Sequence, residues 1–99
     1  MKTVILYSMK GCPHCSSLKK MLKEENLDYH ERNVHEHEKE YQQFVDATKN
    51  EYLPALTLVE IEEGKKPEIQ LLAPDLSFKD LNEATQKVKE FLLLSLIHI

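Results

Sequence analysis

Residues 3–15 of the chain, TVILYSMKGCPHC, contain the patterns from which the fold can be predicted. The segment 3–8 is apolar on both of its alternating faces, which is typical of a central strand buried on both sides. Pro13 suits the first position of a helix, because its missing N–H would have no partner there. Apolar side chains then recur at helical spacing, namely Cys15, Leu18, Met21 and Leu22. The stretch therefore predicts a strand that leads into a helix, with Cys12 and Cys15 at the junction.

The remaining sequence predicts three further strands and two further helices. We expect a half-exposed strand over residues 29–34 and a helix after the polar stretch 35–38. A β-hairpin is expected from the strands 55–62 and 68–72, and Ser77 resembles the capping residue of a last helix. The expected order is β-α-β-α-β-β-α, with the first two strands parallel. This is an α/β architecture with one mixed four-stranded sheet and helices on both faces.

The composition indicates one globular domain of 99 residues. Thirteen basic and seventeen acidic residues give a net charge of −4, and the lack of a basic excess argues against nucleic-acid binding. No apolar run reaches the roughly 18 residues of a membrane span, and the N-terminal apolar segment is too short for a secretory signal. A cytoplasmic location is therefore expected. We assign residues 1–91 to the domain and residues 92–99 to an apolar C-terminal tail.

Cys12 and Cys15 are the only cysteines of the sequence. A disulfide between them would close a very small ring, which restrains the unfolded chain little, so a purely stabilising role explains the pair poorly. In a cytoplasmic protein, a close pair of this kind more often has a catalytic or a metal-binding role.

The strand, the CPHC motif and the following helix, with Leu53-Pro54 before a β-hairpin, resemble the thioredoxin-fold family, and within it the glutaredoxins. The resemblance in element order covers residues 1–91. It implies a thioredoxin fold and thiol–disulfide oxidoreductase activity, with no metal or organic cofactor beyond an external thiol donor. It also implies that the Leu53–Pro54 peptide bond is cis and that the backbone of Leu53 pairs with a substrate strand.

Physical reasoning about the CPHC motif suggests a different role for each cysteine. Cys12 is expected at the helix N-terminus, where unpaired N–H groups and the helix dipole favour a thiolate. Cys15, one turn further and on the buried side, should stay protonated until it is needed. Cys12 would then attack a substrate disulfide and Cys15 would resolve the mixed disulfide. His14 would add a positive charge or a hydrogen bond to the Cys12 thiolate; alternatively, it is an exposed residue with no electronic role.

Glutathione recognition is the point at which the sequence departs from the glutaredoxin pattern. Met9 stands where a cation is usual, and Lys10 follows one place later. The segment 76–77 is Leu-Ser where two glycines are usual, and Asp80 alone remains of an acidic pair. Lys10 and Asp80 stay candidate substrate-binding residues, together with Leu53 and Pro54. The donor is expected to be glutathione or a thioredoxin-reductase system, with the second favoured.

A different class of function remains open, namely a non-enzymatic carrier or binding module for copper or zinc. A closed zinc site would need further ligands beside the two thiolates, such as His30, His35 and His37. A copper carrier would be expected to have Met two residues before the first cysteine, whereas Met9 lies three residues before Cys12. We assign no metal ligand, and the expected partners are a disulfide-containing protein or a small thiol, with a reductase as a further partner.

Overall fold

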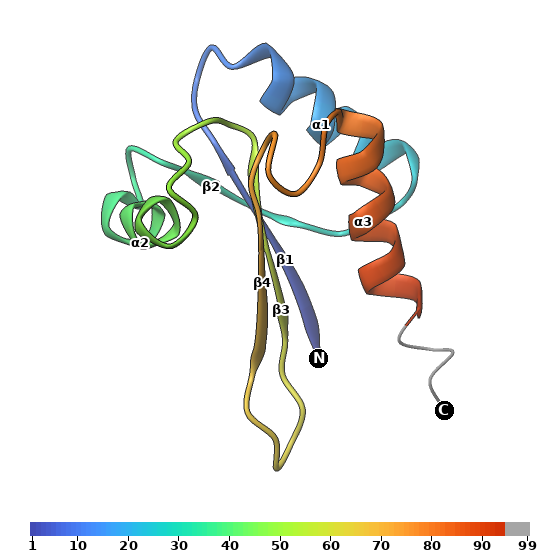
Figure 1. Cartoon of the computed structure of the whole chain (residues 1–99). Coiled ribbons are helices and arrows are strands. Elements are labelled where there is room, and N and C mark those ends of the chain that lie inside the picture. Colours follow the sequence, from blue (N-terminus) through green and yellow to red (C-terminus); the bar gives the residue numbers. More distant parts are fainter. Residues whose placement is uncertain (95–99) are drawn as a thin grey trace.

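The computed structural model describes residues 1–94, which form four strands and three helices (Figure 1). In chain order these are β1 (Lys2–Ser8), α1 (Pro13–Glu24), β2 (His30–Asn33), α2 (Glu38–Thr48), β3 (Ala55–Glu60), β4 (Glu68–Leu72) and α3 (Leu81–Leu94). The sheet order is β2-β1-β3-β4, in which β1 is parallel to β2 and the other two pairs are antiparallel. The predicted element order and mixed sheet of a thioredoxin fold are therefore confirmed.

α1 and α3 lie on one face of the sheet and cover the larger part of the core (Figure 1). Side chains alternate along a strand, so Val4 and Leu6 of β1 point to this face. Leu56 and Leu58 of β3 point to the same face. Their partners on the two helices are Leu18, Leu22, Ala84 and Val88. Each leucine buried here stabilises the fold by roughly 2 kcal/mol relative to an exposed one, and together they hold α1 against the sheet.

α2 packs on the opposite face, mainly through aromatic side chains. The ring of Tyr7 on β1 lies 5.6 Å, between centroids, from the rings of both Tyr41 and Phe44 on α2. The Tyr7 hydroxyl donates to the carboxylate of Glu40, which also pairs with Arg32 of β2. Burial, followed by the hydrogen bond to Glu40, raises the pKa of Tyr7 far above its usual value. Helices therefore cover both faces of the sheet, as predicted.

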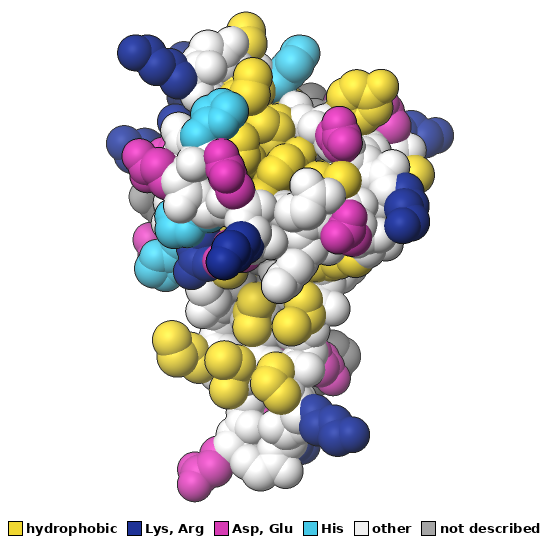
Figure 2. Space-filling model, turned by 90° about the vertical axis from the view of Figure 1, so that its left-hand side faces the viewer, with side chains coloured by type: hydrophobic (Ala, Val, Ile, Leu, Met, Phe, Trp, Pro, Cys, Tyr) yellow, Lys and Arg dark blue, Asp and Glu magenta, His cyan; other side chains and the backbone are white. Residues whose placement is uncertain are grey.

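The β3–β4 hairpin extends beyond the part of the sheet that α2 covers (Figure 1). Figure 2, which views the molecule from the side of α2, shows hydrophobic side chains exposed on this extension. Ile61 and Ile69 are 49% and 62% exposed there. The α2 face of the sheet is thus covered only towards the carboxyl end of β1, where the chain enters the Cys12–Cys15 loop.

The start of α3 differs from the prediction. Asp80 Oδ1 accepts the backbone N–H of Glu83 at 2.8 Å, so Asp80 caps the helix that begins at Leu81. The Ser77 hydroxyl, which the sequence suggests as the cap, accepts the N–H of Ala73 at 3.1 Å and closes the preceding loop. Ser and Asp are both good capping residues, and the path of the neighbouring backbone decides which of them is used.

α3 continues through Leu92, which packs against the core, to Leu94. The boundary predicted between residues 91 and 92 therefore falls within this helix, and residues 95–99 of the predicted tail lie outside the described residues. Among residues 1–94, no helix has the length and apolar character needed to cross a membrane.

Candidate functional site

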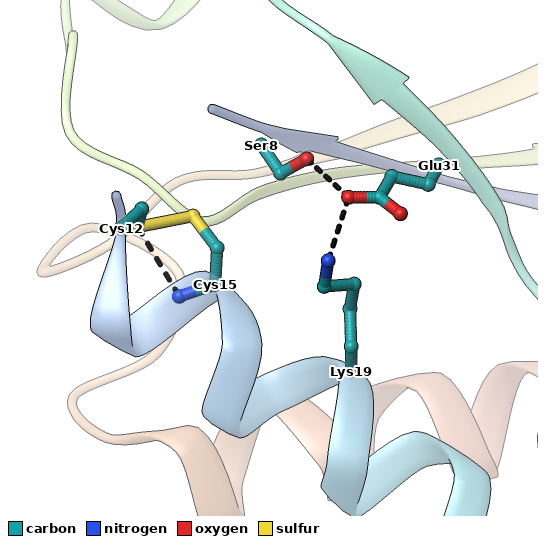
Figure 3. A network of polar contacts seen from close by, with 5 residues as sticks. All are labelled: Ser8, Cys12, Cys15, Lys19 and Glu31. Carbon is teal, nitrogen blue, oxygen red and sulfur yellow. Dashed lines mark hydrogen bonds and ion pairs between the residues drawn. A yellow bond between two sulfur atoms is a disulfide. The ribbon is translucent and has the colours of Figure 1, made fainter. Parts of the chain in front are cut away.

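The Cys12–Cys15 pair lies where β1 passes into α1, and the two side chains form a disulfide with Cα atoms 5.3 Å apart. Cys12 is the N-cap of α1 in an extended conformation, and Pro13 is the first helical residue. The backbone N–H of Cys15 donates to Cys12 Sγ at 3.2 Å (Figure 3). The preceding Gly11 has a φ of +83°, a left-handed conformation that glycine adopts without strain. The sulfur of Cys12 therefore occupies the site where the helix offers an otherwise unpaired N–H.

The two sulfur atoms differ in their accessibility. Cys15 lies on the buried side of α1 with 1% of its surface exposed, whereas Cys12 is partly exposed. An incoming group can therefore reach Cys12 more readily than Cys15. These positions are the ones that the sequence suggested, and the chemical roles of the two thiols stay predictions.

A cavity of about 510 Å³ opens beside the first turn of α1. Three segments enclose it: the start of α1, the residues before β3, and the loop from β4 into α3. The lining residues are His14, Tyr52, Leu53, Pro54, Pro74, Asp75, Phe78, Lys79, Asp80 and Leu81. Most of these side chains are apolar. The Leu53–Pro54 peptide bond is cis, as the resemblance to glutaredoxins implies.

Four of the predicted site residues meet at this cavity, namely His14, Leu53, Pro54 and Asp80. Pro13, the first residue of α1, is not among the lining residues, and neither are Cys12 and Cys15. Lys10 is exposed in the loop before Cys12 and is not a lining residue either. Its contact with a substrate therefore stays a prediction.

Two of the enclosing segments face each other: the residues before β3 form the first wall and the loop from β4 into α3 forms the second. Of the second wall, sequence reasoning identifies Asp80 but not other lining residues such as Phe78 and Asp75. Tyr52, on the first wall, is 67% exposed, and Asp75 has a φ of +67° in the loop after β4. The two walls become neighbours only because the β3–β4 hairpin folds back on itself. The predicted hairpin already implies that the segment before β3 and the loop after β4 are neighbours, but no spacing in the sequence indicates which of their side chains line a cavity.

A polar network near the disulfide joins β1, β2 and α1 (Figure 3). The carboxylate of Glu31 accepts hydrogen bonds from the Lys19 ammonium group at 2.8 Å and from the Ser8 hydroxyl at 2.6 Å. These two donors, Lys19 first, hold the pKa of Glu31 below its usual value. Ser8 is 3% exposed at the end of β1, so the network ties the strand that leads into the cysteine loop to the helix that follows it.

A model of the glutaredoxin family matches residues 4–58, which is more than half of the chain. The chain belongs to the glutaredoxin family. The matched region contains the cysteine pair and the cis Leu53–Pro54 peptide bond, whereas the cavity wall formed by residues 74–81 lies beyond it. A search of curated proteins and a search of solved structures found no match. Glutaredoxin-family membership and the cysteine pair together support a thiol redox role with thiol or disulfide substrates.

The histidines considered for a zinc site do not gather around the cysteines. Within residues 1–94, no group of three or more His, Cys, Asp or Glu side chains has the arrangement of a metal site. The observed β-α-β-α-β-β-α order also differs from the β-α-β-β-α-β order of copper carriers with a Met-x-Cys-x-x-Cys loop.

Proposed function

We propose that this glutaredoxin-family protein is a dithiol–disulfide oxidoreductase that uses Cys12-Pro13-His14-Cys15 to exchange disulfides with protein or small-thiol substrates. The Cys12 thiolate attacks one sulfur of the substrate disulfide, the substrate S–S bond breaks, and the leaving sulfur takes up a proton. Cys15 then loses its proton and attacks the sulfur of Cys12, so that the Cys12–Cys15 disulfide forms and the second substrate thiol leaves. Two electrons pass to the substrate, and an external thiol donor later returns them.

One observation carries this proposal, namely the different surroundings of the two sulfur atoms at the start of α1. Cys12 Sγ accepts a hydrogen bond from the backbone N–H of Cys15, whereas the side chain of Cys15 is buried. In the reduced protein, the same N–H and the positive end of the α1 dipole would stabilise a thiolate on Cys12. Burial disfavours a charged sulfur, so Cys15 would stay protonated until the mixed disulfide forms. His14, in the first turn of α1, would add a positive charge or a hydrogen bond to the Cys12 thiolate.

The cavity beside the pair supports the binding of a segment that carries the substrate disulfide. The backbone of Leu53, next to the cis Pro54, would pair with an extended substrate segment. Asp80 lines the cavity and Lys10 precedes the cysteines, so both are proposed to contact polar groups of the substrate. Most of the cavity surface is apolar, which suits a polypeptide side chain as well as a small thiol.

We further propose a thioredoxin-reductase system, rather than glutathione, as the external donor. Met9 and the Leu76-Ser77 pair replace the cation and the two glycines of the glutaredoxin pattern. No bound cofactor takes part in this cycle. A cytoplasmic location belongs to the same proposal, because that compartment supplies reducing equivalents to a thiol pair.

The test is a reaction of the fully reduced protein with insulin, which contains disulfides. Acid-quenched samples, analysed by mass, should show a mixed disulfide at Cys12, then the Cys12–Cys15 disulfide together with free insulin thiols. A separate equilibrium titration against glutathione redox buffers gives the reduction potential of the Cys12–Cys15 pair. If neither the mixed disulfide nor the Cys12–Cys15 disulfide forms with any disulfide substrate, the oxidoreductase proposal is wrong.

A further inference from the structure

The two walls of the cavity diverge where the sheet ends. In the β3–β4 ladder, the last pair on the side of the cavity is Leu56 with Leu72. Beyond it, Pro54 lies in one wall and Pro74 in the other. Neither proline has an N–H with which to continue the ladder. Hydrogen bonding within the sheet therefore does not extend far enough to set the distance between the walls.

The side chain of Asn50 makes a connection that the ladder lacks. Asn50 follows the C-cap of α2 and is 8% exposed. Its Nδ2 donates to the carbonyl oxygen of Pro74 at 2.8 Å, and its Oδ1 accepts the backbone N–H of Tyr52 at 2.9 Å. Tyr52 and Pro74 belong to opposite walls. Within residues 1–94, no other hydrogen bond outside the sheet ladder joins these two segments.

Each wall is also ordered by contacts of its own. In the loop after β4, the N–H of Asp75 donates to the carbonyl oxygen of Phe78 at 2.9 Å. In the segment before β3, the carbonyl oxygen of Glu51 accepts the hydroxyl of Tyr41 on α2 at 2.9 Å. Loss of the Asn50 side chain would therefore leave both walls formed, but they would no longer be held at one separation.

We propose that Asn50 is a positioning residue that sets the spacing of the two cavity walls for a polypeptide disulfide. This inference rests on the proposed function. Asn50 does not line the cavity and acts through Tyr52 and Pro74. Its loss weakens the binding of a segment that contacts both walls, while the reaction at Cys12 proceeds as before. A small disulfide, which does not span the two walls, is unaffected.

The test compares insulin, a polypeptide disulfide, with cystamine, a small one, in single-turnover oxidation of the fully reduced protein. Quenched samples analysed by mass give a half-saturating concentration and a maximal rate for each substrate. Asn50→Ala removes both side-chain hydrogen bonds, of which the one to Pro74 joins the walls. It should raise the half-saturating insulin concentration about fivefold, as expected for the loss of that link at about 1 kcal/mol. The maximal rate with insulin, and both values with cystamine, should stay within about twofold of wild type.

Asn50→Asp gives a second variant in case the alanine variant folds poorly. Aspartate keeps the acceptor for the N–H of Tyr52 but has no donor for Pro74, so it should also raise the half-saturating insulin concentration. Amide hydrogen exchange provides a readout without turnover: the N–H of Tyr52 should lose protection in Asn50→Ala and keep it in Asn50→Asp. Tyr41→Phe is the matched control, because it removes a hydrogen bond to the same segment and leaves the link to Pro74 intact.

The outcomes separate the two proposals. If either Asn50 variant binds insulin as wild type does, or if Tyr41→Phe weakens insulin binding as much as Asn50→Ala, the positioning role is wrong and the oxidoreductase proposal stands. If the wild-type protein is oxidised by neither disulfide, both proposals fail.

Discussion

Cys12 and Cys15 carry the same thiol group, yet the first turn of α1 places them in different surroundings. The sulfur of Cys12 lies at the helix N-terminus within reach of a backbone N–H, and that of Cys15 is buried. The helix terminus favours a negative charge, whereas burial opposes one. Both effects therefore make Cys12 the thiol that loses its proton more readily.

The first prediction concerns this difference. In the reduced protein at about pH 6, well below the usual range of a free thiol, iodoacetamide should modify Cys12 and leave Cys15 unmodified. Peptide mass mapping after short labelling measures the ratio of the two products. A urea-unfolded sample is the control, since unfolding removes both the helix terminus and the burial. Equal labelling of the two cysteines in the folded protein would contradict the assigned roles.

The second prediction separates the two cysteine variants. Cys12→Ser should abolish disulfide exchange, because no accessible thiolate remains to attack the substrate. Cys15→Ser should still form the mixed disulfide with insulin and then stall, because no second thiol can displace it. Mass measurement of quenched reactions distinguishes the trapped adduct from free protein. An adduct with Cys12→Ser and none with Cys15→Ser would reverse the order of attack.

At the scale of elements, the position of α1 against the sheet depends on both apolar and polar contacts. Leu18 and Leu22 of α1 are buried against the sheet, and Lys19 of the same helix is joined to β1 and β2 through Glu31 and Ser8. The apolar contacts supply most of the stability, whereas the network fixes the helix relative to the end of β1.

The third prediction follows from the lowered pKa of Glu31. A carboxyl whose pKa is lower in the folded state stabilises the fold above its unfolded pKa, and this contribution is lost as the pH falls through the folded value. Glu31→Gln keeps an acceptor for Ser8 but loses the ion pair with Lys19. It should lower the free energy of unfolding at about pH 7 by less than about 1 kcal/mol, because the pair is partly exposed to solvent.

Urea unfolding of Glu31→Gln and wild type, measured between about pH 7 and about pH 2, should show the difference shrinking as the pH falls below the usual glutamate range. Glu36→Gln serves as the control, since Glu36 is exposed and makes no ion pair within residues 1–94. A difference between Glu31→Gln and wild type that stays constant at every pH would show that the ion pair with Lys19 is not its cause.

The fourth prediction concerns Asp80, which both caps α3 and lines the cavity. Asp80→Ala removes the acceptor for the N–H of Glu83 and should lower the free energy of unfolding by about 1 kcal/mol. Asp80→Asn should retain most of this stability, because asparagine is a good N-cap, while it removes the charge from the cavity. Urea unfolding of both variants measures the change in the free energy of unfolding. Equal destabilisation by the two substitutions would mean that the charge, rather than the capping hydrogen bond, stabilises the helix.

At the level of the whole molecule, the proposed choice of electron donor concerns the loop after β4. Leu76 in this loop is 66% exposed, and the hydroxyl of Ser77 accepts a hydrogen bond from the backbone N–H of Ala73. A glycine pair would leave the backbone here open to close approach, whereas these side chains restrict it. The same loop contributes the cavity wall that faces Tyr52 and Leu53. Under the donor proposed above, Leu76 and Ser77 would hinder the approach of glutathione to this wall.

The fifth prediction compares the two donor systems on insulin at equal protein concentration. Thioredoxin reductase with NADPH should support faster turnover than glutathione with glutathione reductase, because the cation and the glycine pair for glutathione are both replaced. Met9→Lys restores one cation and should raise glutathione-dependent turnover by up to about fivefold, the most expected of one exposed ion pair. NADPH consumption measures both reactions. Efficient, saturable turnover with glutathione in the wild-type protein would contradict the prediction.

Much of this architecture could be predicted from local patterns. Alternating and helical apolar spacing identified the strands and helices, and Pro13 placed Cys12 at the start of α1, because these signals arise from neighbouring residues. The sequence suggests Ser77 as the helix cap, whereas Asp80 caps α3, since both residue types suit that position and only the surrounding backbone distinguishes them. The resemblance to glutaredoxins added the cis Leu53–Pro54 peptide bond, which no propensity would have indicated.

The order of the elements and the place of the cysteine pair follow from the sequence alone, because both depend on contacts between residues close together in the chain. The set of residues that encloses the cavity, in contrast, is visible only in the folded chain. The β3–β4 hairpin brings Asn50 within hydrogen-bonding distance of Pro74, which is 24 residues away along the chain. A contact of this kind depends on where the sheet ends and on how two loops leave it, and neither of these has a periodicity or a motif in the sequence.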